Sequence, residues 1–239
     1  MISIIIPALN EENYLPRLLG SLEKQNLKDY EIILADAGSK DRTIEIAKKY
    51  GCKVVPGGLP AKGRNEGAKA ARGDLFLFLD SDLVLPEGFL DVFLQEFKKK
   101  NLDIASTDLD FLTDKKIYKI AAFLCNIYYR CTQRILPHIS QCILVKKEFH
   151  NRIGGFDEEI KLSEDFAYIK KMCKIAKFGH ISKIKFYSSA RRFEKDGLIN
   201  TFLKYLLAHI YIAFFGPIKS DIFKYRFNHY SKSKKNNFL

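Results

Sequence analysis

Two carboxylates separated by one small residue, Asp80-Ser81-Asp82, directly follow the apolar run Leu75–Leu79. A short unbroken apolar run after Gly73 predicts a strand covered on both faces, as in the middle of a parallel sheet. The two aspartates would then lie at the carboxyl edge of that sheet, where open α/β folds bind their ligands. Carboxylates this close repel each other unless a cation is near, so the pair indicates a divalent metal and a phosphate-bearing substrate. In an isolated motif, a capping aspartate followed by a solvated one is the commoner arrangement, so the other segments must decide.

Polar residues also follow two other predicted strands. The segment Pro7–Glu12 follows the strand Ile2–Ile6, and Asp36-Ala37-Gly38-Ser39 follows Glu31–Ala35. The carboxyl ends of parallel strands share one edge of the sheet, so residues far apart in the chain meet there. Asp36 could accept a hydrogen bond from an N–H of a nucleobase, or could simply cap the next helix. Three such strand ends together favour a ligand site.

The elements that position these residues alternate regularly. Four short apolar segments are predicted strands, and each is followed by a segment with helical spacing. The predicted strands are 2–6, 31–35, 53–55 and 75–79, and the predicted helices begin near Asn10, Asp41, Gly63 and Pro86. This alternation predicts an α/β fold with a doubly wound, mostly parallel, Rossmann-like sheet.

Beyond residue 103 the pattern is looser. Further strands are predicted at Asp103–Ser106, Gln141–Val145 and His180–Tyr187. The apolar and basic segment Lys115–Ile135 is predicted to form one long helix, and another helix is predicted to begin at Ser163-Glu164-Asp165.

The C-terminal region has a different character. Apolar residues keep a 3–4 spacing from Ile199 to Phe214, and Gly216-Pro217 ends the pattern. The tail Lys219–Leu239 carries six basic residues against Asp221 alone. An apolar run too short to span a bilayer, next to basic residues, is typical of an interfacial helix. We therefore expect peripheral membrane contact through residues 199–239, with packing of this helix on residues 115–135 as the alternative.

Composition sets wider limits. A chain of 239 residues can bury a full core, and 47% hydrophobic content excludes global disorder. The formal charge of +12 predicts an anionic partner, which could be nucleic acid, a phosphorylated substrate or an acidic membrane. The apolar run Ile2–Ile6 is too short for a signal peptide. The five scattered cysteines are expected to be reduced core thiols of a cytosolic protein.

Five motifs, in order and at ordinary spacing, resemble family 2 of the inverting glycosyltransferases, which have the GT-A fold. The resemblance covers roughly the first 170 residues. The motifs are Ile4-Ile5-Ile6-Pro7-Ala8-Leu9-Asn10-Glu11-Glu12, Asp36-Ala37-Gly38-Ser39-Lys40-Asp41-Arg42-Thr43, Lys62-Gly63-Arg64-Asn65-Glu66-Gly67, Asp80-Ser81-Asp82, and Gly154-Gly155-Phe156-Asp157 followed by Glu164-Asp165.

We predict a domain plan from the motifs and the C-terminal pattern together, and the resemblance implies a donor pocket. Residues 1–190 would be the catalytic domain, with 1–106 binding the nucleotide-sugar and 107–190 the acceptor, followed by a C-terminal amphipathic helix and basic tail at 191–239. The pocket would be lined by Pro7, Ala8, Glu11, Asp36, Lys62, Arg64, Asp80, Ser81 and Asp82.

Within this implied pocket, Lys62 and Arg64 would lie beside the nucleotide and diphosphate. Asp80 would lie by the ribose, and Asp82, with Asp80, would hold Mn²⁺ or Mg²⁺. One departure is that many relatives have two aspartates before the Gly-Ser, whereas Asp36 stands between two alanines here. This weakens any inference about the base.

The chemistry implied for this site needs a cation and a base. A departing nucleoside diphosphate gains negative charge, which a hard cation and basic side chains stabilise. The acceptor hydroxyl must lose its proton to a general base, and by resemblance this base is Asp165. Without the other motifs, a helix start would be the better interpretation of that residue. The pair Arg191-Arg192 could reach the diphosphate, although paired arginines are more often solvated. The lone His180 is more often structural and is left out of the metal site.

We therefore predict a metal-dependent inverting glycosyltransferase that moves a sugar from a UDP- or GDP-sugar to an acceptor hydroxyl. A glycan or lipid-linked acceptor at the inner face of the cell membrane is expected, and nucleic acid is not. A nucleotidyltransferase is the nearest alternative, but no Gly-rich loop with a basic residue follows the first strand. A dehydrogenase fits less well because GxGxxG is absent. A non-catalytic basic protein that binds membrane or nucleic acid is opposed by the intact Asp80, Asp82 and Asp165.

Overall fold

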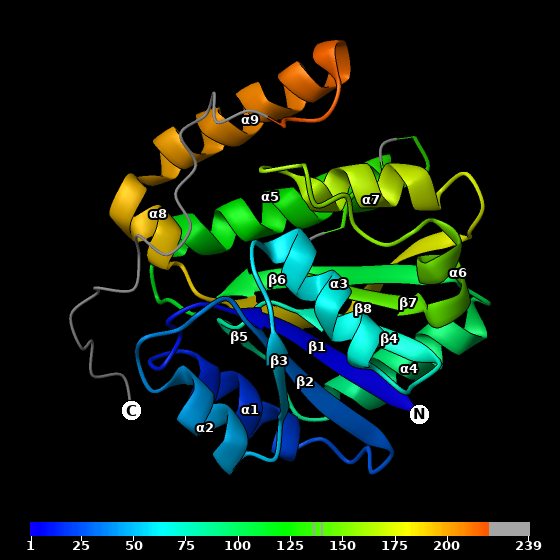
Figure 1. Cartoon of the computed structure of the whole chain (residues 1–239). Coiled ribbons are helices and arrows are strands. Elements are labelled where there is room, and N and C mark those ends of the chain that lie inside the picture. Colours follow the sequence, from blue (N-terminus) through cyan, green and yellow to red (C-terminus); the bar gives the residue numbers. More distant parts are fainter. Residues whose placement is uncertain (136, 140, 220–239) are drawn as a thin grey trace.

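The apolar segments of the first half form the parallel strands of one sheet. The computed structural model describes residues 1–219 apart from 136 and 140. The strands β1 (Ile2–Ala8), β2 (Tyr30–Asp36), β3 (Lys53–Pro56) and β4 (Leu75–Leu79) pair in parallel in the order β3-β2-β1-β4 (Figure 1). Each of the first three strands is followed by a helix, which returns the chain so that the next strand can run in the same direction.

The strands that follow β4 in the chain extend the same sheet. The strand β7 (Cys142–Lys146) lies antiparallel to β4 and is followed in space by β6 (Ile104–Phe111), β8 (Phe178–Ser188) and the short β5 (Leu83–Val84). β6 and β8 are parallel, whereas β5 is antiparallel to β8. The sheet is therefore mostly parallel, as predicted, with antiparallel strands only in its second half.

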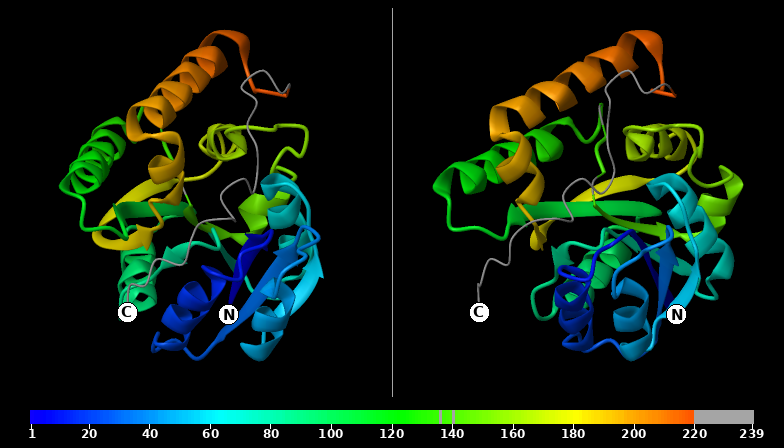
Figure 2. Two further views of the ribbon diagram at one scale, coloured as in Figure 1. Left: turned by 90° about the vertical axis from the view of Figure 1, so that its left-hand side faces the viewer. Right: turned by 60° about the vertical axis from the view of Figure 1, so that its left-hand side comes forward.

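Helices cover both faces of this sheet (Figures 1 and 2). One face carries α1 (Leu15–Glu23), α2 (Thr43–Lys49) and α4 (Phe89–Lys99), and the other carries α3 (Pro60–Ala70), α6 (Lys147–Arg152) and α7 (Glu164–Met172). The remaining helices, α5 (Lys116–Thr132), α8 (Arg191–Asp196) and α9 (Leu198–Phe215), lie on the side of β6 and β8. The doubly wound arrangement that was predicted is confirmed.

Some boundaries differ from the prediction. Pro7 continues β1 instead of ending it. The pairing of β1 with β4 stops at Ile5, so the missing N–H of Pro7 faces a side where the ladder has already ended. The first helix begins at Leu15, after Asn10 has adopted a left-handed conformation with φ 53°. The carboxamide oxygen of Asn10 instead accepts a hydrogen bond of 2.7 Å from the Lys40 N–H, which ties the loop after β1 to the loop after β2.

A close approach of α3 to β1 depends on two glycines one helical turn apart. A Cβ at Gly63 would lie 3.0 Å from the Pro7 Cβ, and a Cβ at Gly67 would overlap Cγ2 of Ile5. Ile5 is fully buried in the sheet and cannot move aside easily. The absence of side chains at these positions therefore sets how closely α3, which carries Arg64, lies above the strand ends.

The described side chains of the C-terminal helix α9 differ in exposure. Ala208 and Ile212 form a small apolar cluster with Leu162 and Ile218, whereas Ile199, Leu203 and Leu207 are exposed. No helix in the described part of the chain is long and apolar enough to cross a membrane. The basic tail predicted to contact a membrane falls outside the described residues from 220 onward.

The five cysteines form no disulfide, in line with the expectation of reduced thiols. Only Cys52 and Cys142 are buried, however, while Cys131 and Cys173 are exposed. The expectation that all five belong to the core was wrong, because Cys131 near the end of α5 and Cys173 after α7 lie on outward positions.

We expect Gly67→Ala to destabilise the protein by about 1–2 kcal/mol, because overpacking against Ile5 outweighs the better helix propensity of alanine. Gly20→Ala is the matched control, since a Cβ there meets only the Tyr50 hydroxyl at 3.8 Å. Gly20→Ala should stabilise α1 by up to about 1 kcal/mol. Urea unfolding of both variants tests this; equal effects of the two substitutions would contradict the close approach.

Candidate functional site

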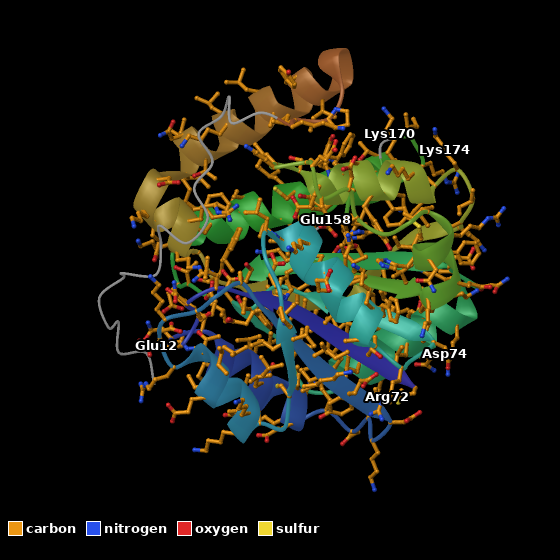
Figure 3. The ribbon with its side chains drawn as sticks, in the orientation of Figure 1. Glu12, Arg72, Asp74, Glu158, Lys170 and Lys174 are labelled. Carbon is orange, nitrogen blue, oxygen red and sulfur yellow. The ribbon has the colours of Figure 1, made fainter. Side chains whose placement is uncertain are left out.

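The two aspartates after β4 lie at the carboxyl edge of the sheet, and each pairs with a different arginine. Arg64 Nη2 lies 2.9 Å from Asp80 Oδ1, and Arg191 Nε lies 3.1 Å from Asp82 Oδ2. Figure 3 marks the two ends of the sheet: Glu12 belongs to the loops at this edge, whereas Arg72 and Asp74 lie before β4 at the opposite edge. The predicted convergence of strand ends is therefore present in the fold.

Arg64 also reaches the start of α7. Its Nη1 donates a hydrogen bond of 2.6 Å to Glu164 Oε1, so one guanidinium bridges Asp80 and Glu164. Only 5% of Arg64 is exposed. Burial alone would lower the pKa of Arg64, but the two carboxylates raise it above its usual range, and the group stays charged. This bridge joins α3, the Asp80–Asp82 segment and α7 at one point.

Asn65, the next residue of α3, holds the loop that precedes α7. Its carboxamide oxygen accepts the Phe156 N–H at 2.9 Å, and its Nδ2 donates to the Phe156 carbonyl and to Glu158 Oε1, both at 2.9 Å. Glu158 lies beside α3 in Figure 3. Gly155 has φ +75°, and a Cβ there would lie 2.6 Å from the Asn65 oxygen. Two motifs about ninety residues apart in the chain are thus locked together.

Asp165, the second residue of α7, is a partly buried carboxylate beside this bridge. Burial and the neighbouring Glu164 carboxylate raise the pKa of Asp165 to about 7, against the opposing effect of Arg64. Asp80 adds to the increase, which shows that Asp165 and the segment after β4 share one electrostatic environment. A carboxylate with such a pKa can take up or release a proton near neutral pH.

Arg191 forms a second cluster of charges on the other aspartate. Its guanidinium makes two hydrogen bonds to Glu11, of 2.7 and 2.8 Å, in addition to the ion pair with Asp82. It also lies over the Tyr14 ring, with Cζ 4.3 Å from the ring centroid. Burial raises the pKa of both Glu11 and Asp82, while Arg191 opposes this by favouring their charged forms.

The position of Arg191 follows from strand pairing. The short strand β5 pairs with the end of β8, with Leu83 opposite Ser188. The Ser189 N–H then donates a hydrogen bond of 3.2 Å to the Asp82 carbonyl. Two residues later the chain turns into α8, and Arg191 points back to the carboxylates. Arg191 thus lies beside Asp82 because of a strand, β5, that was not predicted. Its contact with the diphosphate stays a prediction.

Asp36, at the end of β2, has an unpaired oxygen. Its Oδ2 accepts the N–H groups of Gly38 and Ser39 at 2.9 and 3.0 Å. Its Oδ1 is buried and has no hydrogen-bond partner among the described residues. A buried acceptor without a partner is costly, so this oxygen is suited to accept an N–H from a ligand.

The other predicted pocket residues divide into two groups. Pro7 and Ala8 lie opposite Ala35 and Asp36 in the β1–β2 pair, and the Ser81 hydroxyl hydrogen-bonds the Glu11 carboxylate. These residues join the same edge. Lys62 is exposed, and its stem lies against Gly58.

Lys62 and Arg64 are two positions apart on α3, which places them about 200° apart around the helix. Lys62 makes no ion pair with a described carboxylate in this structure. The two basic residues of the motif therefore point in different directions, and only Arg64 contacts the aspartates.

The metal prediction rests on oxygen donors alone. Asp80 and Asp82 are hard oxygen ligands of the kind that Mg²⁺ and Mn²⁺ take, but no group of three His, Cys, Asp or Glu side chains in the described residues is clustered as a ready metal site. A metal held here would need further ligands from substrate or water. His180 lies elsewhere, with Nε2 2.7 Å from Asp108, which supports leaving it out.

Three residues of the site went unassigned in the sequence. Glu164 and Asn65 were assigned only to motifs of the resemblance, and Tyr14 was given no role. The charged pair Glu164-Asp165 could have signalled a buried basic partner. No local signal in the sequence identifies Tyr14 as the platform for Arg191.

The fold identifies the class of protein. The structure superposes on the crystal structure of Staphylococcus aureus TarS 1–349 in complex with UDP-GlcNAc with a TM-score of 0.67 and 22% identity, over 89% of this chain and 73% of that one. Glucosyl-3-phosphoglycerate synthase from Mycobacterium tuberculosis, in complex with Mn²⁺, UDP and phosphoglyceric acid, gives a TM-score of 0.59 and 20% identity, over 87% and 78% of the chains. The fold is that of the GT-A glycosyltransferases.

Sequence comparison identifies the family. The profile described as glycosyl transferase family 2 matches residues 3–152, and the chain belongs to this family. The uncharacterized glycosyltransferase EpsJ of Bacillus subtilis (strain 168) is 37% identical over 185 residues, which cover 69% of this chain and 54% of EpsJ. Chondroitin synthase of Pasteurella multocida (strain Pm70) is 28% identical over 199 residues, covering 77% of this chain and 20% of that protein. The chain thus spans about half of one relative and a fifth of the other.

The raised pKa of Asp165 predicts that the free energy of unfolding depends on pH. Between about pH 4 and 7 the folded state keeps a proton that the unfolded state releases, so the free energy of unfolding falls as the pH rises through this range. Asp165→Asn cannot ionise, and we expect its stability relative to the wild type to increase by about 1 kcal/mol or more between pH 5 and pH 8. Urea unfolding at both pH values measures this.

The control for this comparison is Glu159→Gln, which alters a carboxylate that is 73% exposed in the same region. Its stability relative to the wild type should change little over the same interval. An advantage of Asp165→Asn that is equal at both pH values would contradict the raised pKa.

Proposed function

We propose that this family 2 chain is a metal-dependent inverting glycosyltransferase, which moves a sugar from a UDP- or GDP-sugar to an acceptor hydroxyl. Residues 1–190 would be its catalytic unit, with Arg191 completing the site from the following helix. The observation that carries the proposal is the buried Arg64 bridge between Asp80 and Glu164. The bridge supports a single reacting centre that has donor-side carboxylates on one side and Asp165 on the other.

The nucleotide would bind along the ends of β1 and β2. The unpaired buried Oδ1 of Asp36 would accept an N–H of the base, and Pro7, Ala8 and Glu11 would line the pocket. The TarS crystal structure with UDP-GlcNAc and a mannosyltransferase structure with GDP-Man and Mn²⁺ have the same fold, which supports a nucleotide-sugar donor.

The diphosphate would lie at Asp80-Ser81-Asp82. Asp82, with Asp80, would hold Mn²⁺ or Mg²⁺, which when bound would neutralise charge on the leaving diphosphate. Their oxygen-only donor set suits such an ion, because Mg²⁺ usually takes one or two carboxylates and completes its shell with phosphates and water. Arg191 would add a fixed positive charge beside the leaving group, and its stacking on Tyr14 holds it in place.

Asp165 would be the general base. An inverting transfer needs a base on the face of the sugar opposite the leaving diphosphate, and it works best with a pKa near the operating pH. The raised pKa of Asp165 meets this condition. Arg64 keeps that pKa from rising further, so that a useful fraction of the carboxylate is ionised at neutral pH.

The acceptor would be a lipid-linked or cell-envelope glycan at the inner face of the membrane. The exposed apolar residues of α9 support peripheral contact through residues 199–239. The part of this segment from residue 220 onward lies outside the described residues.

Asp82→Asn and Asp165→Asn should separate donor binding from transfer. Asp82→Asn removes a metal ligand, so stabilisation of the protein by UDP-sugar with Mn²⁺ should disappear in a thermal-shift assay, together with the release of nucleoside diphosphate. Asp165→Asn should keep that stabilisation and lose at least about 100-fold in transfer rate.

Glu159→Gln serves as a control that should keep both properties. Full transfer by Asp82→Asn, or by the wild type in excess chelator, would contradict metal dependence. Release of pyrophosphate in place of nucleoside diphosphate would instead indicate a nucleotidyltransferase.

Asp36→Asn should weaken donor binding by about tenfold or more, because the variant loses one charge-assisted hydrogen bond to the base. The Gly38 and Ser39 N–H groups would retain the amide oxygen, which leaves the NH₂ group facing the base. Isothermal titration with UDP and GDP measures the loss. Unchanged affinity for both nucleotides would show that Asp36 does not contact the base.

A further inference from the structure

The outward face of α5 is apolar along its length. Tyr118, Ala122 and Asn126 are buried against the domain, and residues two positions further on lie about 200° around the helix. Those outward positions are occupied by large apolar side chains instead of polar ones. The exposed members are Ile117, Ile120, Phe123, Leu124, Ile127 and Tyr128, of which Phe123 is 62% and Leu124 59% exposed. We call these six residues the α5 face.

The charged residues of the segment that carries the α5 face have one sign. The segment 115–135 contains five basic residues, Lys115, Lys116, Lys119, Arg130 and Arg134, and no acidic one. Lys116, Lys119 and Arg134 are exposed. Lys115 pairs with Glu194 and Arg130 with Asp108, so Lys116, Lys119 and Arg134 supply the positive charge beside the α5 face. A helix with an apolar outward side flanked by such basic residues is complementary to an interface that is apolar inside and anionic at its surface.

The helix α9 adds a second apolar strip on the same side of the molecule. It runs above α5 in all the views of Figures 1 and 2. Its Ile199, Leu203 and Leu207 are exposed, whereas its Ala208 and Ile212 are buried. The alternative in which α9 covers the α5 face is contradicted by the exposure of that face. Exposed apolar side chains on two neighbouring helices suit a broad partner better than a single peptide.

We propose that the α5 face, together with Ile199, Leu203 and Leu207 of α9, inserts into the headgroup region of an anionic lipid bilayer. A second copy of the chain would bring two sets of basic side chains together, which is unfavourable. The basic tail after residue 219 is repelled by the same charges. An anionic membrane satisfies both the apolar side chains and the lysines around them.

This surface adjoins the candidate active site. Phe193 lies two residues after Arg191. The centroid of its ring is 5.0 Å from that of Phe111 and 6.2 Å from that of Tyr118 on α5. Lys115 and Glu194 also pair across this junction at 3.4 Å. The short helix α8 therefore contacts α5 through Phe193 and Asp82 through Arg191. This connection would keep a lipid-borne acceptor within reach of the site.

The full chain contains no tryptophan, so Phe123→Trp introduces a single fluorescent probe into the α5 face. With vesicles containing phosphatidylglycerol we expect its emission to shift to shorter wavelength and to be quenched by brominated lipid chains. Lys49→Trp on α2, far from this surface, should show neither effect. An unshifted, unquenched Phe123→Trp spectrum with vesicles would overturn the proposal.

Vesicle flotation then tests the residues themselves. Ile120→Ser with Leu124→Ser should lower binding to anionic vesicles by about tenfold or more, whereas Leu59→Ser, an exposed apolar residue on another surface, should have little effect. Replacing Lys116, Lys119 and Arg134 by Gln should also cost about tenfold, and replacing Lys48, Lys49 and Lys99 by Gln removes the same charge from α2 and α4 as a control.

Thermal unfolding confirms that each variant is folded before binding is compared. If the double serine variant binds anionic vesicles as strongly as the wild type does, the proposal is overturned and the tail is left as the membrane contact. A concentration-dependent dimer that the double serine variant abolishes, without vesicle binding by the wild type, would identify an interface between copies instead. Because no donor or acceptor is present, failure here is distinct from failure of the proposed transferase activity.

Discussion

A buried guanidinium surrounded by carboxylates is the interaction on which the site depends. Arg64 is almost wholly removed from water, and its desolvation is offset only because Asp80 and Glu164 both pair with it. Asp80 directly follows β4, and Glu164 begins α7. The Arg64 guanidinium therefore holds the end of β4 close to the start of α7. It also limits the rise in the pKa of Asp165.

The same arrangement occurs a second time around Arg191. Its partners, Glu11 and Asp82, come from the loops after β1 and β4, and its own position comes from the end of β8. Asp80 and Asp82 thus pair with different cations, and the small Ser81 lies between them in the chain. Two like charges in so short a segment are tolerable because each has its own counter-charge.

Close backbone packing makes these pairs possible. Gly63 and Gly67 let α3 approach β1 more closely than any larger residue would allow, and Arg64 and Asn65 lie on the turn between them. Asn65 then fixes the loop before α7 by three hydrogen bonds, so the approach of one helix positions residues from two regions of the chain. Packing in the core therefore fixes the positions of the site residues, although the core side chains take no part in the chemistry.

Local signals in the sequence determined much of this protein. Short apolar runs ended by Gly, Pro and Asp predicted β1 to β4, and their alternation with helices predicted that Pro7, Asp36, Asp80 and Asp82 would share an edge. That inference succeeds because parallel strands have a common direction, which any sequence with this alternation must respect. The tertiary structure alone decided which charges meet: Arg64 with Glu164, and Arg191 with Glu11. Those pairs depend on the two-residue strand β5 and on contacts 100 and 180 positions apart in the chain, for which the local pattern carries no signal. It also decided that the apolar outward side of α5 stays uncovered, because helical spacing shows that a helix has an apolar side but not whether the rest of the chain packs against it.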